Sequence, residues 1–259
     1  VASVCEMLGY DPLYLACENG NAAIAARLLR AGSDPNAIAF PTRISPLMIA
    51  ARTGDVGVVE ALLTHGARVE HRETGYQQTA LMWAAAQGHA NVVGALIKGG
   101  ADVAARSAVR RTQAVLGSRF SGRSVHDVPE GGFTALLFAA RQGGVSSSQF
   151  LLEACADVNE ATPDGTRALV VAAHSGHGAL ATLFLDRGAD PNAAGSGYTA
   201  LHAAVLRSDV DLIKALLARG ANPNTLLTRG TPVRRYSKEF ALSDEWRGAT
   251  PFFQAARFD

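Results

Sequence analysis

A short segment of the Thr-Pro-Leu type recurs along this 259-residue chain and constrains its fold more than any other feature. Its copies are Asp11-Pro12-Leu13, Ser45-Pro46-Leu47, Thr79-Ala80-Leu81, Thr134-Ala135-Leu136, Arg167-Ala168-Leu169, Thr199-Ala200-Leu201 and Thr250-Pro251-Phe252. The second positions of successive copies differ by 34, 34, 55, 33, 32 and 51 residues. Two of these intervals equal one period of about 33 residues plus an insertion, and such a period is typical of a solenoid of stacked repeats.

Each copy carries the signals of two short helices. Thr, Ser or Asp suits a helix N-cap, and proline suits the first helical position. Alanine pairs such as Ala50-Ala51 keep one face of the first helix thin, and a glycine such as Gly54 then ends that helix. A second helix follows with one apolar stripe. A closing glycine and an Asp-Pro-Asn or Asp-Val-Asn segment supply the turn chemistry of a hairpin-like finger.

These residues resemble the ankyrin repeat family. The stretch "GYTALHAAVLRSDVDLIKALLARGANPN" is close to the family pattern, and the resemblance extends from residue 11 to about residue 258. It implies an all-α solenoid with helix pairs on the back and fingers along one edge. In this family the fingers and first helices form a concave surface that binds other macromolecules, usually proteins, and nothing in the resemblance implies catalysis.

The period predicts a single solenoid over residues 1–259, with six repeats and part of a seventh. Residues 1–10 are predicted to be a cap or a truncated preceding helix. The repeats are predicted at about 11–42, 43–76, 77–105, 130–162, 163–194, 195–226 and, in part, 249–259. The two long insertions fall at finger positions, at about 106–129 and 227–248.

Both insertions are basic, although the whole chain is nearly neutral, with 24 Lys and Arg against 23 Asp and Glu. The insertions hold Arg106, Arg110, Arg111, Arg119, Arg123, Arg229, Arg234, Arg235 and Lys238. Arginine recognises carboxylate and phosphate alike. Three interpretations stay open: solvated loops, contact with an acidic protein partner, and contact with a phosphate-rich ligand. A nucleic-acid partner is not favoured, because Phe120 and Tyr236 alone offer little stacking surface.

The remaining candidate contact residues come from finger tips and from first-helix positions just after the small pair. Tyrosine and arginine among them are the side chains most often found at binding hot spots. Trp83 is interpreted as packing. The candidates are Arg72, Tyr76, Gln77 and Tyr198 in fingers, and Arg52, Gln87, Arg141, Gln142, His174 and Arg207 on helices.

No pattern predicts catalysis, a cofactor or a metal site. Phosphate-binding and nucleophile-elbow motifs are absent from the sequence, and the histidines lack paired ligand spacing. Cys5, Cys17 and Cys155 show no ligand spacing, and three is an odd number for a disulfide framework. No apolar run reaches the length of a membrane span, and no signal peptide is visible at the start.

Several departures from the repeat pattern carry expectations of their own. Cys155 replaces a closing glycine. The run Ser146–Ser148 includes two positions where other copies have apolar pairs. Arg167 takes a cap position, and Thr166 is expected to serve as the cap instead. The roles of Cys155 and of the serine run stay open.

The last segment is expected to expose Phe252, Phe253 and Phe258, so end-to-end self-association into filaments is one alternative function. An accessory binding module of a larger enzyme is the other. The stretches "GGFTALLFAARQG" and "TPVRRYSKEFALSDEWRGATPF" also resemble ankyrin-rich proteins of environmental bacteria, many of which are exported. Localisation therefore stays open between the cytoplasm and an exported or periplasmic site.

Overall fold

The computed structural model describes residues 11–39, 41–116, 124–230 and 246–256. The chain divides into two compact units, which are considered separately below. Unit 1 comprises residues 1–108 and 133–156, and unit 2 comprises residues 109–132 and 157–259. The predicted cap at residues 1–10 lies outside the described residues.

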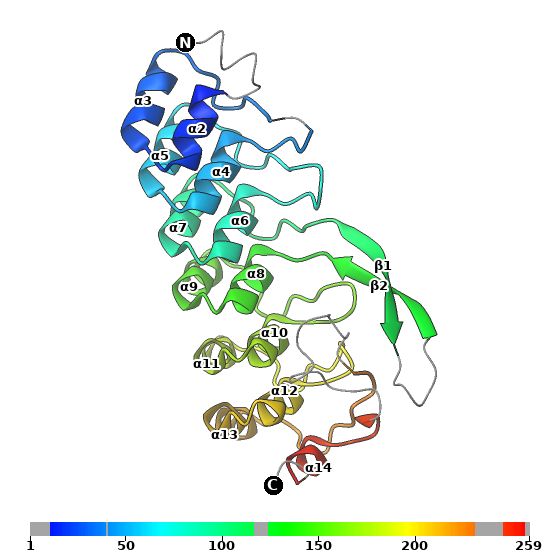
Figure 1. The fold of residues 1–259 in the computed structure, drawn as a ribbon. Helices are drawn as coiled ribbons and strands as arrows, with labels where there is room; N and C mark the ends of the chain where they lie inside the picture. The colour runs from blue at the N-terminus through cyan, green and yellow to red at the C-terminus, as the bar shows by residue number, and fades with distance from the viewer. Residues whose placement is uncertain (1–10, 40, 117–123, 231–245, 257–259) are drawn as a thin grey trace. The chain divides into compact units, whose positions relative to one another are not determined.

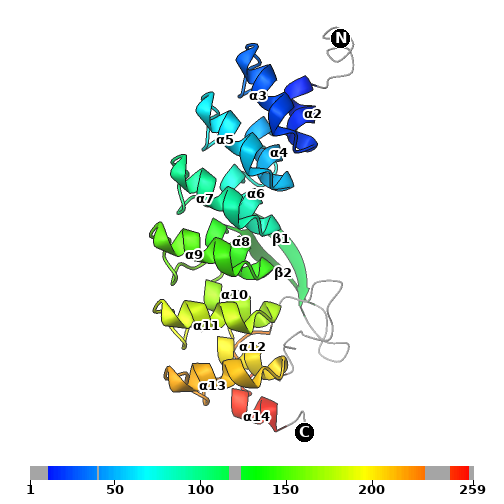
Figure 2. The ribbon, with the colours of Figure 1, turned by 90° about the vertical axis from the view of Figure 1, so that its left-hand side faces the viewer.

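Unit 1 consists of consecutive helix pairs, each of which falls inside one predicted repeat (Figure 1). The first helices of neighbouring pairs pack on one another, and so do the second helices, so that each set forms its own column (Figure 2). The pairs are α2 (Pro12–Glu18) with α3 (Ala22–Arg30), α4 (Pro46–Thr53) with α5 (Val56–Thr64), α6 (Ala80–Gln87) with α7 (Ala90–Lys98), and α8 (Ala135–Gln142) with α9 (Val145–Glu153).

Unit 2 repeats this arrangement and adds a two-stranded antiparallel sheet. The helix α10 packs on α12, α12 packs on α14, and α11 packs on α13. The elements are β1 (Val109–Leu116), β2 (Ser124–Gly131), α10 (Ala168–Ser175), α11 (Gly178–Asp186), α12 (Ala200–Leu206), α13 (Val210–Ala218) and α14 (Pro251–Ala255).

The first insertion therefore forms a β-hairpin, in which Val109 is paired with Gly131 and Leu116 with Ser124. Its neck is closed within unit 1, where the Ser107 N–H donates to the Phe133 carbonyl and the Phe133 N–H donates to the Ser107 hydroxyl, both at 3.0 Å.

The ends of the second insertion are pinned in unit 2. Leu227 is buried, its N–H donates to the Ala249 carbonyl at 2.8 Å, and its carbonyl accepts the Gly248 N–H at 2.8 Å. Residues 231–245 of this insertion lie outside the described residues.

The predicted helix caps are confirmed in most repeats. Five N-cap side chains accept a backbone N–H of the first turn; they are Asp11, Ser45, Thr79, Thr199 and Thr250. Arg167 makes no such bond, as expected. Thr166 does not replace it, because its hydroxyl donates to the Asp164 carboxylate at 3.0 Å and is directed toward the preceding turn.

Four alanine pairs of the first helices are almost completely buried, which places them where neighbouring helices meet, whereas Ala255 and Ala256 at the end of α14 are exposed. Each alanine of the four buried pairs is at most 1% exposed. These pairs are Ala50, Ala51, Ala84, Ala85, Ala139, Ala140, Ala172 and Ala173. A larger side chain would hold adjacent repeats apart, because protein interiors have little free volume.

From Ser45 onward, the residue two positions before the cap of each first helix has a positive φ. Gly165 (φ 84°) and Gly197 (φ 95°) fill this position in unit 2, whereas Arg43 (φ 56°) and Gln77 (φ 54°) fill it in unit 1. A side chain in this conformation costs about 1 kcal/mol. The finger turn is therefore imposed by the repeat architecture, even where the sequence does not favour it.

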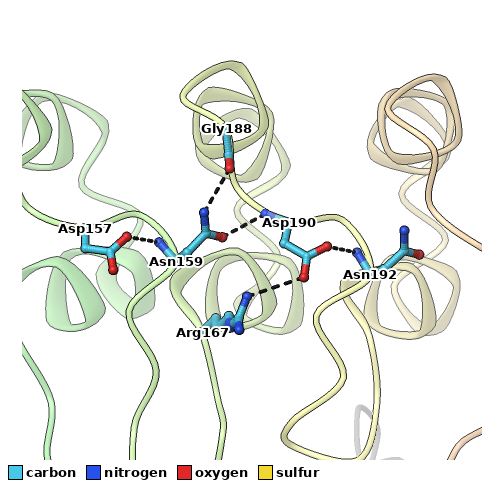
Figure 3. A network of polar contacts seen from close by, with 6 residues as sticks. All are labelled: Asp157, Asn159, Arg167, Gly188, Asp190 and Asn192. Carbon is cyan, nitrogen blue, oxygen red and sulfur yellow. Dashed lines mark hydrogen bonds and ion pairs between the residues drawn. The ribbon is translucent and has the colours of Figure 1, made fainter.

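Asparagine side chains connect consecutive repeats (Figure 3). The Asn159 amide donates to the Gly188 carbonyl at 3.0 Å and accepts the Asp190 N–H at 2.8 Å. Asn192 bridges Gly220 and Asn222 in the same way. The Asp-Pro-Asn segments thus stabilise the stack as well as the local turn.

Cys155 adopts the left-handed conformation (φ 66°) that was expected of a closing glycine, and its side chain is exposed. In the same repeat Ser147 and Ser148 are buried at the positions where α5 has Val58 and Val59. Nothing in the structure explains the two hydroxyls.

Replacing Cys155 by glycine should therefore stabilise the protein. Cys155→Gly is expected to raise the free energy of unfolding by about 1 kcal/mol, because glycine adopts positive φ without steric cost. Urea unfolding followed by circular dichroism measures the change. Cys155→Ala is the control, since it removes the thiol and keeps Cβ, and an equal gain in that variant would refute the explanation.

Asn159→Ala should destabilise the stack in unit 2. It removes two hydrogen bonds between repeats, each of which contributes about 1 kcal/mol. The expected loss is about 2 kcal/mol by urea unfolding. Asn36 makes the same pair of bonds in unit 1, to the Gly66 carbonyl and the Arg68 N–H, so Asn36→Ala should show a loss of similar size. A change below about 0.5 kcal/mol in both variants would contradict the assignment.

The buried His202 should make stability depend on pH. Its Nδ1 accepts the Thr199 N–H, and burial lowers the pKa of the imidazole, against the opposing effect of backbone hydrogen bonds. The unfolded chain then binds more protons below about pH 6.5, so the stabilising contribution present above that pH is lost as the pH falls, by at most about 1.4 kcal/mol per pH unit.

Urea unfolding at pH 7.5 and pH 5.5 tests this expectation. The wild type should lose more stability between the two pH values than His202→Gln, which has no titrating group at this position. Equal losses in the two proteins would show that His202 does not titrate in this range.

Candidate functional site

The most sharply defined candidate surface lies on the second finger of unit 1, residues 70–78. Glu73 organises it from inside: the carboxylate is only 6% exposed and accepts the N–H groups of Gly75, Tyr76 and Gln78. The Tyr76 bond is 2.6 Å long and the Gln78 bond 3.0 Å. One buried side chain therefore fixes the tip of the finger.

The second finger is also bound to the chain on one side of it. The His71 imidazole lies 2.6 Å from the Arg43 carbonyl, and the Thr74 N–H donates to the Thr42 carbonyl at 3.0 Å. These bonds join the second finger to residues 41–45, which belong to the first finger.

On its other side the finger is bound to the segment that enters the first insertion. The Arg72 guanidinium donates to the carbonyl groups of Gln77 (3.2 Å) and Arg106 (2.6 Å), and the Ala108 N–H donates to the Tyr76 carbonyl at 2.6 Å. The structure thus gives Arg72, which was predicted to contact a partner, a bracing role inside the finger.

Tyr76 is presented to solvent at the tip of this finger, as predicted. Its side chain is 53% exposed, although its backbone N–H and carbonyl are both engaged. Arg43 and Arg106 are exposed on the neighbouring segments, and Gln77 is exposed beside Tyr76. Sequence analysis did not identify Arg43 as a contact candidate. Its place two residues before the cap Ser45, in a finger turn, could have indicated it.

The inner helices of unit 1 place two predicted arginines on aromatic rings. The Arg52 guanidinium lies 5.7 Å from the centre of the Trp83 ring and 3.6 Å from the Glu18 carboxylate. Arg141 lies 5.3 Å from the ring of Phe138 and 5.8 Å from that of Phe133. Both arginines are exposed on one side, so each forms a cationic surface over an apolar base.

The structure corrects the position of Tyr198 in unit 2. This side chain was expected at an exposed finger tip but is only 7% exposed, with its ring centre 5.9 Å from that of His174. Burial, with a smaller effect from Asp164, raises the pKa of the phenol. The ring is enclosed because Tyr198 directly precedes the cap Thr199, whose own side chain is buried.

Two further arginines act within the scaffold of unit 2. The Arg229 guanidinium donates to the carbonyl groups of Ser196 (3.1 Å) and Asp164 (3.3 Å), which joins the start of the second insertion to both preceding fingers. Arg207 donates to the carbonyl of His174 at 2.8 Å. Arg229, which was predicted to contact a partner, thus braces neighbouring fingers in this structure.

The remaining basic candidates fall into two groups. Arg110 and Arg111 lie on β1 and are exposed. The other candidates of the insertions, four arginines and one tyrosine, lie outside the described residues; they are Arg119, Arg123, Arg234, Arg235 and Tyr236.

The described part of the chain holds no cluster of three His, Cys, Asp or Glu side chains that suits a metal ion. Burial raises the pKa of the Cys17 thiol to about 12, so it stays protonated at neutral pH. None of the helices that the structure describes has both the length and the apolar character needed to cross a bilayer.

Comparison with known proteins agrees with this architecture. A family model described as ankyrin repeats matches residues 13–107, 120–195 and 136–226. An ankyrin repeat-containing protein of Treponema pallidum (strain Nichols) is 39% identical over 111 residues, which are 42% of this chain and 37% of that protein. The chain thus matches little more than a third of that relative's length, and the relative is bacterial, as the resemblance had suggested.

A solved structure adds support for the fold. The crystal structure of the human ASB11 ankyrin repeat domain superposes with a TM-score of 0.71 and 22% sequence identity, over 96% of this chain and 97% of that domain. Ankyrin repeats are generally protein–protein interaction modules. The family model covers most of the sequence, and the helix pairs, caps and fingers follow one register throughout, so the chain belongs to the ankyrin repeat family.

Proposed function

We propose that this chain is a non-catalytic scaffold that binds an acidic protein partner through its fingers and inner helices. The observation that carries the proposal is the second finger of unit 1, which is rigid and presents the exposed ring of Tyr76. A preorganised loop loses little conformational entropy on binding, so more of the contact energy appears as affinity.

The charge of this surface favours an acidic partner. The segments 41–45, 70–78 and 103–108 contain three arginines, Arg43, Arg72 and Arg106, against two acids, Glu70 and Glu73, and the Glu70 carboxylate accepts the Asp102 N–H. Because the Glu73 carboxylate is buried and accepts three backbone N–H groups, it offers little negative charge to a partner. Exposed positive charge of this kind accelerates association with an acidic surface and selects against basic ones.

Arg52 and Arg141 extend this surface onto the inner helices of unit 1. Each guanidinium is held over an aromatic ring that restricts its motion, and Arg52 also lies 3.6 Å from the Glu18 carboxylate, so both arginines are preorganised on an exposed surface. In unit 2, Arg110 and Arg111 on β1 form a second basic element that is suited to the same kind of partner.

Charge reversal on the fingers should abolish capture of the partner. The double variant Arg43→Glu and Arg106→Glu is expected to reduce binding at least tenfold. Tyr76→Ala alone should reduce binding by a similar factor, since a hot-spot tyrosine that becomes buried in the interface contributes about 2 kcal/mol or more. Capture from cell extract on immobilised protein, quantified by mass spectrometry at low and high salt, measures the effect.

A matched control keeps the same change in net charge. Arg27→Glu with Arg30→Glu reverses two exposed arginines on α3, an outer helix of unit 1. This variant should capture the partner as the wild type does. The proposal fails if both double variants behave alike, or if raising the salt concentration leaves capture unchanged.

A further inference from the structure

A groove of about 440 Å³ lies on the outer helices of unit 1, away from the residues that form the finger surface. The helices α5, α7 and α9 follow one another in the outer column of unit 1 (Figure 2), and side chains of all three line the groove. Its volume falls in the range of sites that accept a large side chain or a small ligand.

The floor of the groove is open because α7 has a glycine at its centre. The three atoms nearest to a Cβ built on Gly94 belong to the ring of Phe150 and lie at ordinary contact distances of 3.7–3.8 Å. Packing therefore does not require glycine here, and a glycine inside a helix costs conformational entropy relative to alanine. Glycine therefore lowers helix stability at a position that lines the groove.

One wall of the groove is an exposed aromatic ring. Phe150 on α9 is 39% exposed, and the equivalent positions of α5 and α7 hold Ala61 and Ala95. Val145, on the same helix, is also 39% exposed. At the Phe150 position this repeat thus places an aromatic ring in solvent where α5 and α7 have alanine.

The rim of the groove carries more negative than positive charge. Glu60 on α5 and Glu153 on α9 flank it, with Lys98 on α7. None of the three forms an ion pair with another residue in the described ranges. An occupant with an apolar centre and basic flanks would complement both the lining and the rim.

We infer that this groove binds a segment of a protein partner whose large apolar side chain is flanked by lysine or arginine. The apolar side chain occupies the space above Gly94 and packs against Phe150, and the flanking cations face Glu60 and Glu153. The inference does not rest on the finger surface, which favours acidic partners. The two surfaces together would allow unit 1 to hold partners of opposite charge.

The test uses short fluorescent peptides with a central tryptophan and two lysines on each side. Matched peptides carry glutamate in place of lysine, or alanine in place of tryptophan. Fluorescence anisotropy gives the affinity, and amide chemical shifts locate the contact. The lysine–tryptophan peptide should bind at least tenfold more tightly than either matched peptide and should shift amides of α5, α7 and α9.

Variants of the full chain separate binding from folding. Gly94→Leu should weaken peptide binding at least tenfold while urea unfolding stays cooperative, because leucine favours the helix more than glycine does and the neighbouring Phe150 ring is partly exposed. Ala23→Leu, which adds the same side chain to the exposed face of α3, should leave affinity unchanged. Glu60→Lys with Glu153→Lys should reverse the preference toward the glutamate-flanked peptide.

The inference is overturned if the lysine–tryptophan peptide does not bind saturably, if its binding is unaffected by Gly94→Leu, or if the charge reversal leaves its preference unchanged. Shifts confined to the second finger, residues 70–78, would also overturn it. The finger variants are tested by capture of a partner, and the groove variants by peptide binding and by the amide shifts of α5, α7 and α9. Either proposal can therefore fail while the other holds.

Discussion

Close packing between the first helices of neighbouring repeats is the interaction on which the remaining structure depends. Alanine pairs such as Ala84-Ala85 are fully buried there and let adjacent helices approach closely, while caps such as Thr79 set where each helix begins. A helix pair of this length cannot bury its own apolar face, so each repeat is stable only against its neighbours. The fingers inherit their spacing from this stack.

The stack stabilises finger conformations that would be unfavourable in an isolated loop. Arg43 and Gln77 hold positive φ angles, and Glu73 is buried as an acceptor for finger N–H groups, and none of these features stabilises an isolated loop. Neighbouring repeats compensate, through bonds such as Thr74 to Thr42 and Ala108 to Tyr76. The result is a loop held by hydrogen bonds on both sides, with one aromatic ring left in solvent, which is the arrangement expected of an interaction surface.

The arginines of this chain fall into different classes once their surroundings are known. Arg72 and Arg229 donate to carbonyl groups of adjacent fingers, Arg52 and Arg141 lie over aromatic rings, and Arg110 faces solvent on β1. The guanidinium suits all three roles because it combines a planar face with several fixed donors. A count of positive charge along the sequence therefore overestimates the number of arginine side chains that a partner can contact. The charge reversal proposed above changes two exposed arginines, Arg43 and Arg106.

The sequence alone determined the repeat register, the helix pairs, most of the caps, the family and the positions of both insertions, because these features depend on local preferences that recur at a fixed period. It also identified Tyr76 as exposed. The tertiary structure alone decided that Tyr198 is buried, that Arg229 is a brace, that Asn159 joins two repeats, and that Gly94 and Phe150 frame a groove. Each of these outcomes depends on contacts between residues of different repeats. Local conformational preference carries no information about which side chains of a neighbouring repeat will make those contacts.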